Sequence, residues 1–317
     1  MIRFGLCCQF VRAPIKFRTT TVAYLKKLKE TKNEFLSTIL LDNSKALEMA
    51  IVHCSELGIG SFRISSRIFP AYTHGEEGYR LADLPASERI VNQLKTCKRV
   101  AKTHDIRLTF HPDQFVVLST PNEEVLEKSL SEIEYHNLVA DMVGADVITI
   151  HAGGVYGDKK KALKRFEKAF KQLSSSAQKK LALENDDRSY TPCDLLPLCH
   201  ILHIPLVYDV HHHRCLPDAL SEVEATREAL KTWNREPLFH LSSPHKGWKG
   251  PQPFRHHEYI DINDFPKNWM KIDPLTVEIE AKGKELAILK LKTHLTQKMP
   301  EWAGCRGQST AHRSSPN

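Results

Sequence analysis

The sequence predicts a single-domain α/β fold, a (β/α)8 or TIM barrel, and three observations lead to it. Short apolar runs with strand character alternate with helical segments, and this alternation favours a parallel sheet. There are eight such runs, the number that closes a parallel barrel. The length, 317 residues, is one that an α/β barrel fills as one domain, and no linker-like break divides it.

Each strand candidate is a short run rich in Val, Ile, Leu or Phe that ends at polar or glycine-containing residues. The runs are 2–6, 61–65, 107–110, 146–150, 181–183, 204–208, 238–241 and 275–279. An open doubly wound sheet is the alternative arrangement of the same elements. No Gly-x-Gly-x-x-Gly follows any of the runs, so a dinucleotide cofactor has no support.

The helical segments show apolar residues at spacings of three and four. They are expected from Val22 onwards, from Asn43 to about 57, and over 87–104, 123–143, 159–173, 193–202, 219–233 and 285–296. Asn43 and Ser44 are placed at a helix start because their side chains favour N-cap positions. The lysine-rich segment 159–173 is best explained as the solvent-facing side of an outer helix. Periodicity stops near residue 297, which predicts a barrel domain over 1–296 and a disordered tail over 297–317.

The composition excludes several classes of protein. No apolar run approaches the roughly 20 residues that cross a bilayer, so no membrane partner is expected. The 8 cysteines include no Cys-x-x-Cys pair and no signal peptide precedes the first strand, which predicts reduced thiols and a cytoplasmic location. A formal charge of +7 favours an anionic partner. The 17 histidines are the outlier, and many of them follow strand candidates.

Metal-ligand residue types recur where the strand candidates end. Five of them directly follow a run: His111, His151, Glu184, Asp209 and Glu280. A sixth, His240, lies within a run, and the seventh, His74, lies in a loop. All strand carboxyl ends of a parallel barrel open onto one face, so these side chains are expected to converge. Taken singly, each is equally a core histidine or a capping carboxylate, and the repetition is what favours a metal site. Histidine and carboxylate without cysteine fit Mn²⁺ or Zn²⁺.

The number of these residues predicts more than one ion. A single tetrahedral ion needs fewer ligands, so two or three ions are expected, with Glu184 or Asp209 as bridges. Two ions about 3.5–4 Å apart are a standard means of activating water in phosphodiester cleavage. Three consecutive imidazoles follow at His211, His212 and His213. Because they cannot all point the same way, one or two of them at most are expected to share a site with Asp209.

The chain also carries a set of motifs in a fixed order. They are Arg63-Ile-Ser-Ser-Arg-Ile-Phe-Pro-Ala-Tyr-Thr-His74, His111-Pro-Asp-Gln-Phe115, His151-Ala-Gly-Gly-Val-Tyr-Gly157, Leu183-Glu-Asn-Asp186, Asp209-Val-His-His-His213, His240-Leu-Ser-Ser243 and Ile279-Glu-Ala-Lys-Gly-Lys-Glu285. In this order they resemble the motifs of the UV damage endonucleases, and the resemblance runs from Ile2 to about Glu285. Each motif is weak alone, whereas the ordered set is specific.

This resemblance implies a barrel like that of endonuclease IV and a nuclease that nicks double-stranded DNA immediately 5′ of UV photoproducts. Cyclobutane dimers and 6-4 products are the implied lesions, with abasic sites as a further candidate. A three-metal centre is implied, with Mn²⁺ the expected ion and Zn²⁺ or Mg²⁺ as alternatives. A monomer is expected, in a bacterial-type cytoplasm and at the nucleoid when it acts.

Residue roles follow from the motif positions. The implied ligands are His74, His111, His151, Glu184, Asp209, His212, His240 and Glu280, with His257 as a ninth. The implied catalytic residues among them are Glu184, Asp209 and Glu280. Gln114 and Phe115 match the pair that probes the gap beside a flipped lesion. Lys282 and Lys284 are placed to neutralise phosphate charge, although solvation of a helix start explains either equally well.

The chain departs from the family pattern at three positions. Leu238 replaces a lysine two residues before the histidine of the His-Leu-Ser motif, so a modified lysine near the metals is unavailable. Phe115 replaces a tyrosine and keeps the stacking face without the hydroxyl. Leu6, the remaining candidate for lesion contact, replaces an aromatic residue at the end of the first strand.

Two other functions remain open at this stage. A metal-dependent sugar isomerase or epimerase uses similar ligands on the same barrel, and fold alone does not decide function. It predicts a small enclosed pocket and no affinity for DNA. A non-catalytic DNA-binding relative is the second alternative, which predicts salt-dependent DNA binding without nicking.

Overall fold

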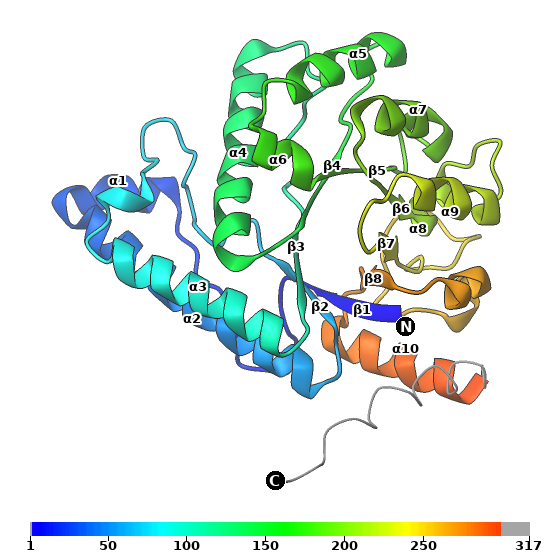
Figure 1. Cartoon of the computed structure of the whole chain (residues 1–317), viewed down its shortest axis with the longest axis horizontal. Helices are drawn as coiled ribbons and strands as arrows, with labels where there is room; N and C mark the ends of the chain where they lie inside the picture. Colours follow the sequence, from blue (N-terminus) through cyan, green and yellow to red (C-terminus); the bar gives the residue numbers. More distant parts are fainter. Residues whose placement is uncertain (1, 299–317) are drawn as a thin grey trace, which may run out of the picture.

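The computed structural model describes residues 2–298, which form a closed barrel with strand order β1-β2-β3-β4-β5-β6-β7-β8 (Figure 1). The strands are β1 (Ile2–Cys7), β2 (Ser61–Ile64), β3 (Arg107–Phe110), β4 (Val147–His151), β5 (Leu181–Glu184), β6 (Leu206–Asp209), β7 (Leu238–Leu241) and β8 (Leu275–Ile279). All neighbours pair in parallel, and β1 closes the ring against β8 with Phe4 opposite Val277. The predicted (β/α)8 barrel is confirmed, and every strand carboxyl end lies on one rim.

Helices surround the barrel on its outside (Figure 1). They are α1 (Val22–Leu28), α2 (Lys32–Glu56), α3 (Ser87–Thr103), α4 (Glu123–Val143), α5 (Lys159–Phe170), α6 (Ser175–Lys180), α7 (Pro192–Leu202), α8 (Val210–Cys215), α9 (Glu222–Lys231) and α10 (Lys284–Lys298). Short 3-10 segments are η1 (Lys29–Thr31), η2 (Leu81–Asp83), η3 (Ile262–Asp264) and η4 (Lys267–Lys271). Local signals fix several ends. On α4, the Asn122 side chain accepts from the backbone N–H of Val125, and Gly144 ends the helix at φ +78°.

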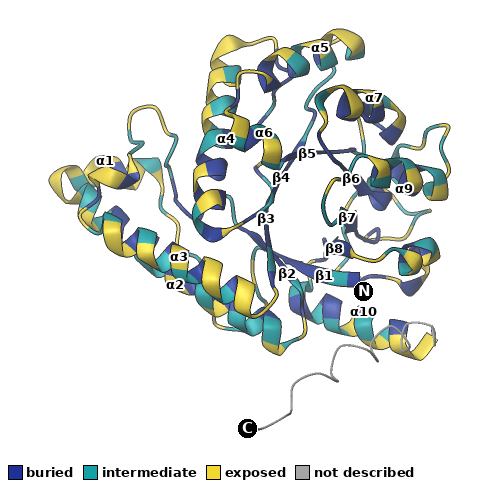
Figure 2. Cartoon of the chain, in the orientation of Figure 1, coloured by how far each residue is buried: buried dark blue, intermediate teal, exposed yellow. Residues whose placement is uncertain are grey.

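The strands are largely buried (Figure 2). Apolar residues lie on both faces of the sheet. One face joins the large core between barrel and helices, to which Ile148 and Ile150 of β4 belong. The other face points to the barrel axis, where Val147, Ala182, Val207 and Leu238 from β4 to β7 form a separate cluster. Because successive residues of a strand face opposite sides, one strand supplies both layers.

The expectation that a helix starts at Asn43 is wrong, because α2 runs unbroken through this position. The Asn43 side chain is buried and donates to the carbonyl of Ile68 at 2.8 Å. The Ser44 hydroxyl donates to the carbonyl of Leu40 in the preceding turn at 2.9 Å. Tertiary contacts and back-bonding therefore satisfy both polar side chains inside the helix. The helices α6 and α8 were not expected from the sequence.

Two further expectations concern the membrane and the tail. Among residues 2–298, none of the helices combines the length and apolar character that a bilayer span requires. Of the tail predicted over 297–317, Gln297 and Lys298 belong to α10. The remainder lies outside the described residues.

Candidate metal centre

Ligand-type side chains line the carboxyl rim because the strands alternate inward and outward residues. On β5, β6 and β7, the inner apolar residues are followed two positions later by Glu184, Asp209 and His240. Residues two apart on a strand face the same side, so these side chains also point to the barrel axis. The same rim carries His151 at the end of β4, and His111 and Glu280 directly after β3 and β8. Leu238 lies in the apolar layer, two residues before His240.

Glu184 is at the centre of this group. Its carboxylate lies 2.7 Å from Nε2 of His111 and 2.8 Å from Nδ1 of His240. His151 and His212 approach the carboxylate at 3.6 and 3.4 Å. The side chain is only 1 % exposed, so four imidazoles surround it in place of water.

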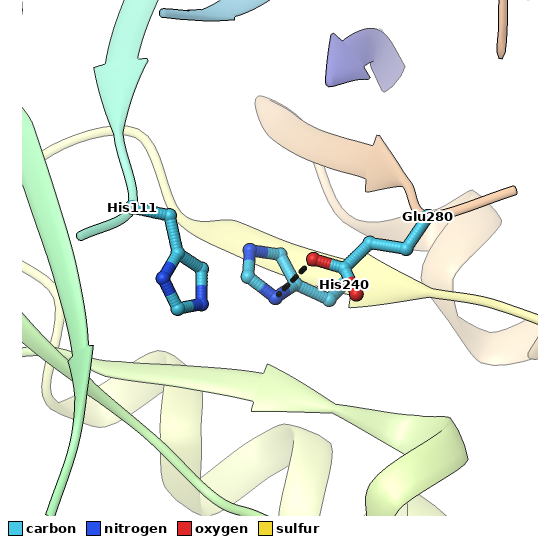
Figure 3. A group of neighbouring side chains, drawn as sticks. All are labelled: His111, His240 and Glu280. Atoms are coloured by element: carbon cyan, nitrogen blue, oxygen red, sulfur yellow. Dashed lines mark ion pairs between the residues drawn. The ribbon is translucent and has the colours of Figure 1, made fainter. Parts of the chain in front are cut away.

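Three overlapping sets of side chains have ligand atoms within 4.8 Å of one another. The sets are His111–His240–Glu280, His111–His151–Glu184 and Glu184–Asp209–His212. Figure 3 shows the first set, with His240 and Glu280 as an ion pair and His111 facing them. The structure thus brings together seven of the nine predicted ligands, including both residues expected to act as bridges.

Buried polar atoms in this centre test whether its residues fit a metal ion. Oδ2 of Asp209 and Nδ1 of His151 make no hydrogen bond within the described chain. Leaving such an atom unpaired costs about 1–3 kcal/mol. Nδ1 of His111 lies 3.0 Å from the carbonyl oxygen of Pro112 and is assigned as its donor, which leaves Nε2 free to face the centre. A divalent cation would satisfy Oδ2 of Asp209, whereas His151 faces the Glu184 carboxylate with its other nitrogen, Nε2, at 3.6 Å. The mixed histidine and carboxylate donors fit Mn²⁺ or Zn²⁺.

The short helix α8 separates the three consecutive histidines. Asp209 is its N-cap and accepts from the backbone N–H of His212 at 2.8 Å, and His212 faces the centre. His213 turns away to the hydroxyl of Tyr208, 2.8 Å from its Nδ1. His211 is buried with its Nδ1 3.3 Å from the carbonyl of Ser242. A helix turns by about 100° per residue, so adjacent side chains diverge.

Two charged residues inside the barrel extend the centre and are missing from the predicted site. The Arg63 guanidinium on β2 pairs with Glu278 of β8 and, at 2.5 Å, with Glu280 just after that strand. It also lies 2.8 Å from Nε2 of His240. Both Arg63 and Glu278 are buried. The sequence could have indicated both residues, because a charged residue is unusual in a buried strand. Glu278 also stands two positions before Glu280, so the two side chains are expected on the same side.

The charges in this centre shift each other's ionisation. Burial raises the pKa of Glu184, but the charges of His240, His151 and His111 outweigh burial and hold that pKa well below its usual range. Burial lowers the pKa of His240, but Glu184 outweighs it and raises that pKa to about 10. For His151, burial prevails over Glu184 and lowers the pKa.

The pKa values of a further carboxylate and a further imidazole shift in the same way, the carboxylate's downwards and the imidazole's upwards. Burial raises the pKa of Glu278, but Arg63 outweighs it and lowers that pKa to about 2. Burial lowers the pKa of His212, but Asp209 outweighs it and raises that pKa well above the usual value. In the metal-free chain Glu184 and Glu278 are therefore ionised at neutral pH. His240 and His212 are protonated there, whereas His151 is neutral.

The ionisation of Glu278 and His240 is expected to stabilise the metal-free chain most between about pH 4.5 and 6.5, the ordinary pKa values of Glu and His. Below pH 4.5 Glu278 becomes protonated in the unfolded chain but stays ionised in the folded chain, so stability falls towards pH 2. Above pH 6.5 the unfolded chain releases protons that folded His240 keeps, so stability falls towards pH 10. Tm measured with chelator from pH 3 to about pH 8.5, where thiols begin to ionise, checks both limbs. A Tm that rises from pH 6.5 to 8.5 would contradict the assignment of His240.

The two other predicted ligands lie outside these sets. His74 is exposed in the loop after β2, where its Nδ1 accepts from the backbone N–H of Glu77 at 3.1 Å. His257 accepts from the backbone N–H of Tyr259 at 3.0 Å and lines a different cavity of about 550 Å³. Its neighbour His256 approaches Glu280 at 3.7 Å. The sequence did not indicate His256. A loop has no regular periodicity, so nothing in the sequence shows which of two adjacent histidines faces the centre.

The predicted lesion-probing pair stands on a tight turn. The backbone N–H of Val116 donates to the carbonyl of Asp113 at 2.9 Å, and the N–H of Phe115 donates to the Asp113 side chain at 3.3 Å. Gln114 and Phe115 are the central residues of this turn and both are exposed, Phe115 by 76 %. The turn begins two residues after His111 and therefore lies at the rim of the barrel.

The other predicted DNA contacts differ in exposure. Leu6 is fully buried in the core between barrel and helices, so it has no surface to offer a lesion. The alternation of β1 explains this, because Gly5 faces the barrel interior and Leu6 must then face outward. Lys282 is exposed in the turn after Glu280, at the rim, and Lys284, the first residue of α10, is partly buried.

Comparison with known proteins identifies the family. The family model described as UV-endonuclease UvdE matches residues 2–305. The chain is 30% identical over 314 residues to the UV DNA damage endonuclease of Bacillus cereus (strain B4264), covering 93% of this chain and 95% of that protein. It is 33% identical over 309 residues to the UV-damage endonuclease of Neurospora crassa, covering 88% of this chain but only 45% of that longer protein.

Solved structures agree on the fold. The crystal structure of SacUVDE superposes with a TM-score of 0.84 at 26% identity, covering 94% of this chain and 99% of that one. Endonuclease IV from Thermus thermophilus gives 0.60 at 14% identity, covering 93% and 99%. The E. coli 3-keto-D-glucoside 4-epimerase YcjR gives 0.57 at 13% identity, covering 92% and 100%. The last two share the fold alone, so the barrel does not decide between nuclease and epimerase, whereas the family model does. The chain belongs to the UV-endonuclease UvdE family, as its ordered motifs predict.

Proposed function

We propose that this chain is a metal-dependent endonuclease that nicks double-stranded DNA immediately 5′ of UV photoproducts. The observation that carries the proposal is the buried Glu184 carboxylate, surrounded by histidines and shared between overlapping ligand sets at the barrel mouth. The names of the family and of its relatives support DNA with UV damage as the substrate. Cyclobutane dimers, 6-4 products and abasic sites are the lesions we propose.

The rim residues would hold two or three divalent ions, with Mn²⁺ as the expected metal. Bound ions supply an activated water and stabilise the departing oxygen in phosphodiester cleavage. Glu184, Asp209 and Glu280 provide the anionic ligands, and the tethering of His111 to the Pro112 carbonyl fixes which nitrogen faces the centre. Glu184 and Asp209 share one ligand set, which supports a bridging role.

The duplex would lie across the barrel mouth, held largely through backbone phosphates. Lys282 and Lys284 at the rim would neutralise phosphate charge beside the metal centre. Damage weakens stacking and pairing, so a damaged dinucleotide is extruded at lower cost than intact bases. The exposed Gln114–Phe115 turn lies beside His111 and would fill the gap left in the stack.

Replacing Phe115 by Ala is expected to weaken binding to dimer-containing duplex by about 5- to 150-fold, because base–aromatic stacking contributes about 1–3 kcal/mol. Phe115→Tyr keeps the stacking face and is expected to bind as the unaltered chain does. Tyr24→Ala removes another exposed aromatic, on the outer helix α1, and serves as the control. Fluorescence anisotropy with damaged and undamaged duplex measures the effect. If the Phe115→Ala variant prefers damaged over undamaged duplex as strongly as the unaltered chain does, the turn takes no part in lesion recognition.

A nicking assay tests the proposed function. The substrate is an end-labelled duplex with one cyclobutane dimer, incubated with the chain and Mn²⁺, and the product is compared with a sequence ladder. A cut immediately 5′ of the dimer and none in undamaged duplex is the expected result, and duplexes with a 6-4 product or an abasic site define the range of lesions. Absence of any cut by folded, metal-loaded chain would refute the proposal. Epimerisation of a ketose by the same sample would then favour the sugar enzyme, and salt-dependent binding alone would favour the non-catalytic DNA binder.

The proposal extends to where and in what form the chain acts. A repair nuclease works at the DNA, so we place it at the nucleoid in a bacterial-type cytoplasm, acting as a monomer. Light scattering during gel filtration, with and without damaged duplex, measures the number of chains in each complex.

A further inference from the structure

A buried carboxylate lies behind the metal centre on the inner face of β8. Glu278 is 1 % exposed and stands on β8, two residues before Glu280, which directly follows the strand. It accepts a hydrogen bond from the hydroxyl of Thr109 and another from Nε of Arg63, the latter at 2.5 Å. Its Oε2 lies 3.2 Å from Nε2 of His240. Glu278 therefore touches one of the proposed ligands from the side opposite the metal-facing atoms.

The barrel provides the space that this carboxylate needs. Gly5 of β1 lies directly beside it, and a Cβ at this position would come within 2.8 Å of the Glu278 Cγ. The Arg63 guanidinium neutralises Glu278 and also pairs with Glu280 at 2.5 Å. A glycine, an arginine and a threonine on neighbouring strands thus hold the Glu278 side chain in one position.

The ring of His240 is contacted on both of its nitrogens. Nδ1 lies 2.8 Å from Oε1 of Glu184 and 3.6 Å from Oε1 of Glu280, which places it on the side of the ligand sets. Nε2 lies 2.8 Å from Nη2 of Arg63 and 3.2 Å from Glu278. A guanidinium can only donate, so Arg63 can hydrogen-bond to Nε2 only when that nitrogen carries no hydrogen. An ionised carboxylate can only accept, so Glu278 can hydrogen-bond to Nε2 only when that nitrogen carries a hydrogen.

We propose that Glu278 is a positioning residue for the metal centre: it accepts the Nε2–H of His240 and so directs the bare Nδ1 of that ring at a metal ion. This inference rests on the metal centre of the proposed function. Nδ1 can donate its lone pair to an ion only when the ring hydrogen is on Nε2, and of the two neighbours of Nε2 only Glu278 accepts it. Histidine ligands are commonly oriented in this way by a carboxylate on their second nitrogen.

The test compares metal binding by the full-length chain and by its Glu278→Gln variant, using calorimetric titration with Mn²⁺ and the visible absorption of bound Co²⁺. Loss of the carboxylate charge is expected to weaken the site that contains His240 by about 10–100-fold and to change the Co²⁺ spectrum. Glu236→Gln is the matched control. Glu236 also pairs with an arginine (Arg3) and a threonine (Thr276), and neither partner is a proposed ligand. This variant is expected to bind both ions as the unaltered chain does.

Separate outcomes distinguish this inference from the function on which it rests. If the unaltered chain binds Mn²⁺ and the Glu278→Gln variant shows the same affinity and Co²⁺ spectrum, the inference is wrong and the metal centre stands. If the unaltered chain binds no divalent ion, the metal centre itself is refuted. Should the variant fail to fold, a crystal structure of the unaltered chain with Mn²⁺ decides the matter. The expected structure has Nδ1 of His240 on the ion and Nε2 hydrogen-bonded to Glu278, and Nε2 on the ion would overturn the inference.

Discussion

Replacing Glu184 by Gln is expected to reduce nicking of dimer-containing DNA by about 10³-fold or more, because residues that act as a unit fail together. The carboxylate lies within 2.8 Å of both His111 and His240 and belongs to two of the three ligand sets. Glutamine is nearly the same size but carries no charge, so it cannot act as an anionic bridge between ions. Single-turnover nicking rates with saturating Mn²⁺ measure the loss.

The same variant is expected to keep the barrel fold, since Glu184 pairs with β4 and β6 through its backbone, which the substitution leaves unchanged. Far-ultraviolet circular dichroism checks this point. Glu48→Gln, a half-buried carboxylate on the outer helix α2, is the control and is expected to nick at the rate of the unaltered chain. A Glu184→Gln variant that keeps full activity would remove the proposed metal bridge.

Removing divalent ions is expected to abolish nicking completely, and adding Mn²⁺ back is expected to restore it. The three ligand sets predict up to three ions per chain, which mass spectrometry of metals or calorimetry counts directly. Zn²⁺ is expected to compete well for these sites, whereas Mg²⁺ is expected to restore least because it prefers oxygen ligands over imidazole. Full activity in excess chelator would contradict a metal-dependent mechanism.

Metal removal is also expected to lower stability without unfolding the chain. An ion at 100 times its Kd stabilises the folded state by about 2.7 kcal/mol. In its absence the carboxylates and imidazoles of the centre still pair with each other, as the contacts of Glu184 show. A rise in Tm with Mn²⁺ that saturates at the same concentration as activity would link both effects to one centre. Glu184→Gln should show a smaller rise.

The strands and the ligand rim could be predicted from the sequence because both depend on local patterns. A strand shows its two faces as alternation, and the parallel order of the strands puts every carboxyl end on one rim. Residues such as Asp209 and His240 therefore converge although they are far apart in sequence. The position of Leu6 in its motif predicted a lesion contact, but the alternation of β1 turns this side chain away from the barrel mouth. Motif position alone therefore did not predict which way the side chain points.

Long-range contacts decided what the sequence left open. Asn43 has the character of a helix cap, but its bond to the carbonyl of Ile68 allows α2 to continue through it. The adjacent His256 and His257 are equivalent in composition and spacing, and only the folding of the β7–β8 connection turns His256 towards Glu280. Such outcomes depend on partners distant in sequence, which no local pattern encodes.

The sequence by itself determined the barrel, the family and most residues of the candidate metal centre, since each follows from strand period, element order or ordered motifs. The tertiary structure alone decided how the inside of the barrel is filled. Arg63 and Glu278 come from β2 and β8, which meet across the barrel only when it closes. Closure buries both charges together and makes their pairing obligatory, because an isolated buried charge is too costly to keep.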